Sequence, residues 1–138
     1  MNVATIRVLT ANERALRALG ETGDGEMPLR FKGVFQDKSP AAAAKIYALL
    51  MKMDVYSGER RCRQVGQAIF AWIFPGLQTP AVRGLQFIRM DNRILVMAFV
   101  VRTEDGKVEV LHPTQVVERG LDTVFAANLI LEITFTAA

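Results

Sequence analysis

The sequence predicts an α+β domain: a mainly antiparallel sheet or pseudo-barrel with one principal helix over residues 40–53 and one short helix over residues 12–19. Three observations predict this fold class. Several short runs alternate apolar and polar residues, turn dipeptides of the hairpin type join some of these runs, and an alanine-rich segment begins with helix-start signals. A chain of 138 residues can bury one hydrophobic core, so we expect a single domain over residues 1–138.

The first third of the chain is expected to contain a strand, the short helix, a loop and a second strand. Residues 3–9 alternate as a strand does, and the more apolar of its two faces consists of Ala4, Ile6 and Val8. Thr10 and Glu13 have the spacing of a capping box, which predicts the start of the short helix. Residues 21–28 are rich in glycine and charge and predict a loop, and alternation over residues 29–34 predicts a strand.

The principal helix has the clearest start signal. Ser39 is a good N-cap, because its hydroxyl accepts a hydrogen bond from a free amide of the first turn, and Pro40 suits the first helical position. Lys45 and Lys52 fall on the solvent side of the helical wheel. The residues spaced to face a core are Ala43, Ile46, Tyr47, Leu50 and Met53.

Strands are expected through most of the second half. Residues 60–74 end in a continuous apolar run and predict a buried strand with a basic approach, followed by a loop over residues 75–82. A meander of three strands is expected next, and its strands cover residues 85–90, 93–102 and 107–111. The segment 116–128 is ambiguous, with a helical turn or two as one interpretation. Alternation over residues 129–135 predicts a last strand.

Positive and negative charges are separated along the chain, although the net charge is only +3. Residues 60–103 carry seven Lys and Arg against one Asp, whereas residues 104–138 carry two Lys and Arg against six Asp and Glu. This separation favours a polar surface that meets an anion or a neighbouring copy of the chain, although an ordinary mixed surface would have the same composition. The apolar fraction of 51% also favours burial of some surface against a partner.

The residues of catalytic chemistry are scarce. Cys62 is the only cysteine and His112 the only histidine, which excludes the usual zinc sets. A nucleophilic pair of Cys62 with His112 remains possible because one residue of each type is present, but the sequence gives it no further support. Because GxGxxG, P-loop and GxSxG motifs are absent from the sequence, we expect no enzyme activity, no cofactor and no metal.

The sequence also bears on the compartment. A single cysteine allows no internal disulfide, so nothing favours an oxidising environment. The first twenty residues lack the apolar core of a signal peptide, and no stretch of 18 uncharged apolar residues predicts a membrane span. We therefore expect an intracellular, non-secreted protein, and a place in a virion is compatible with that.

Two sets of residues are candidates for binding. Arginine suits phosphate contacts, and the candidate nucleic-acid-binding residues are Arg60, Arg61, Arg63, Arg89 and Arg93. The aromatic residues near them either stack on bases or belong to the core, and their place in apolar runs favours the core; they are Phe70, Trp72, Phe74 and Phe87. An apolar edge strand invites pairing with another chain, so the candidate assembly interface is Leu129, Leu131, Ile133 and Phe135.

One element resembles a known family. Gly33-Val34-Phe35, followed by Pro40 and the pair Ala43-Ala44 in a capped helix, resembles the G-x-F-x4-P-x-x-A-A element of the archaeal methanogen chromosomal proteins and their relatives in large DNA viruses. The resemblance implies a small pseudo-barrel with one main helix and a role in bending or compacting DNA. Asp37 and Ile46 depart from the family's common glycine and lysine, as expected of a related scaffold recruited for protein assembly.

The sequence as a whole predicts a non-enzymatic structural or assembly protein, such as a virion or nucleoid component, that contacts other protein chains or copies of itself. The alternative is an architectural DNA-binding protein that contacts the phosphates of duplex DNA through a basic, strand-rich face.

Overall fold

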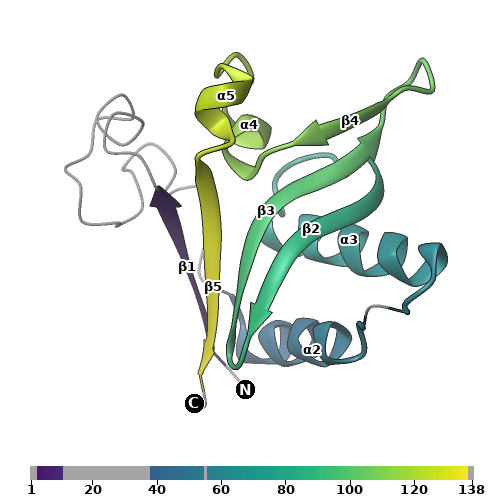
Figure 1. Ribbon diagram of the computed structural model, residues 1–138. Coiled ribbons are helices and arrows are strands. Elements are labelled where there is room, and N and C mark those ends of the chain that lie inside the picture. Colours follow the sequence, from purple (N-terminus) through teal and green to yellow (C-terminus); the bar gives the residue numbers. More distant parts are fainter. Residues whose placement is uncertain (1–2, 11–37, 55, 137–138) are drawn as a thin grey trace.

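The computed structural model describes residues 3–10, 38–54 and 56–136. They form a five-stranded antiparallel sheet accompanied by two longer and two short helices (Figure 1). The strands are β1 (Val3–Thr10), β2 (Ala81–Met90), β3 (Arg93–Arg102), β4 (Val108–Leu111) and β5 (Leu129–Thr136). The strand order is β1-β5-β3-β2, and β4 pairs with the part of β3 that β5 leaves free. The predicted α+β class and antiparallel sheet are confirmed.

The principal helix α2 (Pro40–Met51) starts as predicted. The Ser39 hydroxyl accepts a hydrogen bond from the Ala42 amide over 3.2 Å, and Pro40 occupies the first turn. The helix ends two residues before the expected Met53, at a cap formed by Lys52. The predicted core residues of this helix are confirmed, since Ala43, Ile46 and Leu50 are buried and Tyr47 and Met53 pack against the core.

Residues 60–74 were predicted to be a strand, but nearly all of them belong to a helix. Helix α3 (Glu59–Ile73) buries Val65, Ile69 and Ile73, one at every fourth position, and its exposed polar side chains are Glu59, Arg60, Arg61, Gln64 and Gln67. This spacing is that of an amphipathic helix. The continuous apolar run over residues 68–74 fits a buried strand equally well, so the run alone could not decide between the two.

The predicted three-strand meander is confirmed as β2, β3 and β4. Asp91, in the turn between β2 and β3, has a left-handed φ of 41°, which Asp tolerates better than most residues. Gly106, in the turn between β3 and β4, has a φ of 84°, where a side chain would be strained. In the same turn, hydrogen bonds from the Thr103 hydroxyl and then from the Lys107 amide hold the pKa of Asp105 below its usual value.

The segment 116–128, expected to be ambiguous, contains the end of α4 (Pro113–Val117) and the whole of α5 (Thr123–Ala126). Asp122 starts α5, because its carboxylate accepts hydrogen bonds from the amides of Val124 and Phe125. The predicted helix over residues 12–19 and the predicted strand over residues 29–34 lie outside the described residues. So does most of the element that carries the family resemblance.

The hydrophobic core lies between the sheet and helices α2 and α3. Its aromatic part contains Phe70, Phe74 and Phe99, whose ring centroids lie 5.0 to 6.1 Å apart. Trp72 stacks on Phe135 at 6.0 Å with an angle of 9° between the ring planes. The aromatic residues near the arginines therefore belong to the core, because Phe70 and Phe74 are buried and Trp72 and Phe87 pack against the same cluster.

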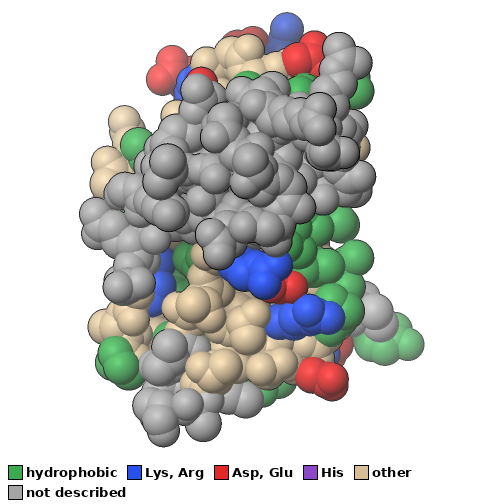
Figure 2. Space-filling model, turned by 90° about the vertical axis from the view of Figure 1, so that its left-hand side faces the viewer, with side chains coloured by type: hydrophobic (Ala, Val, Ile, Leu, Met, Phe, Trp, Pro, Cys, Tyr) green, Lys and Arg blue, Asp and Glu red, His purple; other side chains and the backbone are tan. Residues whose placement is uncertain are grey.

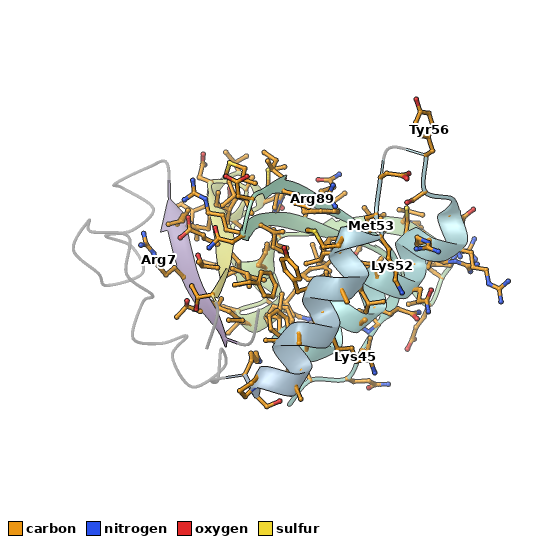
Figure 3. All side chains as sticks on the ribbon, turned by 90° about the horizontal axis from the view of Figure 1, so that it is seen from below. Arg7, Lys45, Lys52, Met53, Tyr56 and Arg89 are labelled. Carbon is orange, nitrogen blue, oxygen red and sulfur yellow. The ribbon has the colours of Figure 1, made fainter. Side chains whose placement is uncertain are left out.

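Cationic side chains from distant parts of the chain contact the C-terminal ends of α2 and α3. Arg89 of β2 donates to the carbonyl oxygens of Leu50 and Met53 at the end of α2, over 2.8 and 3.1 Å (Figure 3). Lys38 lies 3.4 Å from the carbonyl oxygen of Ile73, at the end of α3, and over the Trp72 ring. Partial burial lowers the pKa of Lys38. Positive charge at these positions satisfies free carbonyls and opposes the negative end of the helix dipole.

Candidate interaction surface

In the part of the chain that the structure describes, the two faces of the sheet are covered very differently. Helices α2 and α3 contribute buried residues to one cluster with the inward side chains of β1, β3 and β5, so both helices lie on the same face. The opposite face carries apolar side chains that belong neither to this cluster nor to the residues packed against it. We call it the open sheet face, and its apolar residues are Leu9, Ile88, Leu95, Val100, Val108, Val110 and Ile130.

Strand register places these residues together. Leu9 stands opposite Ile130 across β1 and β5, and Ile88 stands opposite Leu95 across β2 and β3. Val100 stands opposite Val110 across β3 and β4. The most accessible members are Ile88, Val108 and Val110, with 46%, 62% and 43% of their surface exposed. The open sheet face therefore runs across all five strands.

A charged cluster interrupts the apolar residues of this face. Glu132 lies on β5 between Leu131 and Ile133, which point into the core, so its own side chain points to the open sheet face. Its carboxylate oxygens lie 3.0 Å from Nη1 of Arg93 and 3.7 Å from Nε of Arg7. The Glu132 side chain is only 10% exposed, whereas those of Arg7 and Arg93 are about half exposed. The Arg7–Glu132–Arg93 cluster thus carries one excess positive charge.

Figure 2 shows part of the surface on the side of β1. Figure 2 shows basic and acidic side chains close together there, with hydrophobic side chains gathered beside them. Figure 3 shows Arg7 on β1, on the opposite side of the molecule from Lys45 and Lys52 of α2. Both views agree with a charged cluster on the sheet that is separate from the lysines of α2.

The five arginines predicted to contact nucleic acid do not form one face. Arg60, Arg61 and Arg63 lie together in the first half of α3. Arg89 is held at the end of α2, and Arg93 lies on the open sheet face beside Glu132. The expected strand-rich basic surface is therefore wrong in its architecture, since its three neighbouring arginines are on a helix.

The four residues predicted to form an assembly interface lie on an inner strand of the sheet and not on an edge strand. Strand β5 is not an edge strand, because it pairs with β1 on one side and β3 on the other. Its four candidate residues point into the core and are 0 to 1% exposed: Leu129, Leu131, Ile133 and Phe135. They are held within this chain's own fold, so the exposed strand on which the prediction depended does not exist.

Cys62 and His112 each contact a different part of the fold. The Cys62 thiol on α3 lies 3.8 Å from the carbonyl oxygen of Ser57. His112 precedes α4, and its Nδ1 lies 3.1 Å from the carbonyl oxygen of Met97. Within the described ranges, no group of three or more His, Cys, Asp or Glu is placed to hold a metal ion, and no helix is long and apolar enough to cross a membrane.

A cleft with a volume of about 780 Å³ lies beside the β3–β4 hairpin. It is open to solvent, and its lining mixes both charges with amides: Arg102, Glu104, Glu109, Gln115 and Arg119. Apolar side chains such as Val101 and Leu111 contribute to the rest of the lining. The lining contains neither Cys62 nor His112, so the cleft does not unite the residues considered for catalysis.

The sequence contained one signal for the open sheet face that the sequence analysis did not use. Strand β3 reads RILVMAFVVR, and eight apolar residues in succession are typical of a strand covered on both faces. Comparisons of the chain with protein-family models, with curated proteins and with solved structures found no match.

Proposed function

We propose that this protein is a non-enzymatic structural or assembly protein, and that it contacts other protein chains through the open sheet face. The observation that carries the proposal is strand β3. Its sequence has the apolar residues of a strand buried on both sides, yet helices α2 and α3 cover only one side of the sheet.

The physical reason is the free energy of exposed apolar surface. Burial of apolar area stabilises an association by about 25 cal/mol per Å² before the costs of association are subtracted. Contiguous exposed apolar patches are uncommon on monomeric soluble proteins and mark interaction sites. A protein partner on the open sheet face would cover Ile88, Val108 and Val110, which the fold itself leaves exposed.

The proposal is tested by selecting peptides from a random display library on the immobilised protein. Peptides enriched on the unchanged protein should lose binding to the variant Ile88→Lys, because a lysine on β2 would place a charge in the apolar surface. An edge strand tolerates lysine, so the variant should still fold. Val124→Lys is the matched control, since Val124 is 75% exposed on α5 and outside the sheet.

Two results would contradict the proposal. One is the absence of any enriched peptide, and the other is equal binding of the enriched peptides to Ile88→Lys and to the unchanged protein.

A second candidate function is the binding of duplex DNA. One observation favours it: Arg60, Arg61 and Arg63 lie within one turn of α3 and make no ion pair in the part of the chain that the structure describes. Unpaired guanidinium groups on one helix are suited to phosphate contacts.

The DNA candidate predicts binding that weakens steeply with salt, measured by fluorescence anisotropy of a labelled duplex. The double variant Arg60→Gln/Arg61→Gln should reduce the slope of log K against log salt by about two, because each lost phosphate contact releases one counterion fewer. Arg102→Gln is the control, as an exposed arginine at the end of β3. Absent binding, or a slope that the double variant leaves unchanged, would exclude this candidate.

A further inference from the structure

We infer that the chain covering the open sheet face is a second copy of this protein, packed sheet against sheet about a two-fold axis that passes beside Glu132 and Arg93. This inference rests on the proposed function and identifies its partner. The charge, the size and the strand arrangement of the face support it.

The charges of the face complement themselves. In an interface with two-fold symmetry, both subunits contribute the same patch. If residue i of one subunit contacts residue j of the other, then residue j of the first subunit also contacts residue i of the second. Arg93 and Glu132 lie side by side on β3 and β5, with opposite charges 3.0 Å apart. A two-fold axis beside this pair would set the Arg93 guanidinium of each copy against the carboxylate of Glu132 of the partner subunit.

Both arginines retain the capacity for such contacts. A guanidinium has five N–H donors, and Arg93 donates one hydrogen bond to Glu132. Its side chain is 46% exposed, so donors remain available at the surface. Arg7 is 53% exposed on β1, at the margin of the face, where its charge would stay near solvent. The excess positive charge of each cluster would therefore lie on β1, the strand at one edge of the sheet.

The size of the face suits a dimer. Four strands at a spacing of about 4.8 Å and a length of about 25 to 30 Å give a flat area of roughly 500 to 600 Å². The relief of the side chains increases this area toward the roughly 800 Å² per partner of a standard interface. Two twisted antiparallel sheets pack face to face at about 10 Å, with side chains interdigitated, so the partner needs no feature that this chain lacks.

The first test is light scattering coupled to gel filtration over a series of protein concentrations. The unchanged protein should be a dimer, and Ile88→Lys should raise the dissociation constant about a hundredfold, as expected when a charge replaces an apolar contact within the interface. Val124→Lys should remain dimeric. A monomer at every concentration, or a dimer that Ile88→Lys leaves intact, would overturn the inference.

The second test reports on the two-fold contact itself. Arg93→Glu and Glu132→Lys should each be monomeric alone, and an equimolar mixture should form a heterodimer, because acidic and basic clusters then face each other across the axis. Trp72 emission establishes that each variant is folded, since Trp72 is the only tryptophan and packs against the core. Folded variants that fail to associate on mixing would overturn the two-fold arrangement.

The tests separate this inference from the proposed function. If the protein is monomeric and the selected peptides do not bind the variant Ile88→Lys, the proposed function stands. A second copy is then excluded as the partner. Should Glu132→Lys not fold, the comparison of Ile88→Lys with Val124→Lys still decides the inference.

Discussion

At the scale of single residues, Gly66 determines how closely α3 approaches the sheet. A Cβ atom at this position would lie 2.8 Å from Cγ1 of Val82 and 3.4 Å from the backbone of Gly84. Val82 is buried on β2, and a β-branched side chain in such a place has little freedom to move away. The absence of a side chain at Gly66 is therefore a packing requirement of the contact between α3 and β2.

We predict that Gly66→Ala destabilises the protein by about 1 kcal/mol. Overpacking costs about 1 to 3 kcal/mol, and the better helix propensity of alanine returns part of it. The free energy of unfolding in urea, followed by Trp72 emission, measures the effect. Gly76→Ala is the control, because nothing lies within 4 Å of a Cβ at Gly76.

A double-mutant cycle identifies the cause. In a Val82→Ala background the Cγ1 atom is gone, so Gly66→Ala should cost little or become favourable. An equal cost in both backgrounds would contradict the proposed clash.

At the scale of elements, the end of α2 depends on a residue nearly forty positions away. Arg89 of β2 donates hydrogen bonds to two carbonyl oxygens at this end, and α2 has no basic residue in its own last turn. The contact stabilises the helix and also fixes its position relative to the β2–β3 hairpin.

We predict that Arg89→Gln lowers the free energy of unfolding by about 1 kcal/mol, because the charge and at least one hydrogen bond are lost at a partly exposed site. Amide exchange should become faster at Lys52 and Met53, whose N–H groups close the last turn of α2. Arg102→Gln is the control, as another exposed arginine of the sheet. Unchanged exchange in the last turn of α2 would show that Arg89 is not needed there.

Local patterns predicted the elements whose signals are local. Ser39 and Pro40 lie next to the helix that they start, and Asp91 and Gly106 lie within the turns that they form. Helix α3 was missed because a run of apolar residues has no period, although Val65, Ile69 and Ile73 carried the helical spacing.

Pairing between distant segments could not be predicted in the same way. The strand at residues 129–135 was recognised, but its place between β1 and β3 depends on partners far away in sequence. The same limit applies to the arginines. Arg89 and Arg93 flank one turn, yet Arg89 pairs with the inward residue Ile94, whereas Arg93 points to the opposite face.

At the scale of the whole molecule, the residues suited to the two candidate functions lie on different surfaces. Arg60, Arg61 and Arg63 lie on α3, whereas the apolar residues and the Arg7–Glu132–Arg93 cluster lie on the open sheet face. Binding of DNA and association between chains would therefore use different surfaces. The variants of α3 and of β2 should affect the two activities independently.

The pairing of β1 with β5 also governs the order of folding. Val3 stands opposite Thr136, so the first described strand is completed by the last. During synthesis on the ribosome, α2, α3 and the β2–β4 meander can form from near neighbours, while β1 must wait until β5 has emerged. Contacts of such long range slow folding, and an unpaired apolar strand is prone to aggregation. Strand β1 thus remains without its partner β5 until residues 129–136 have been synthesised.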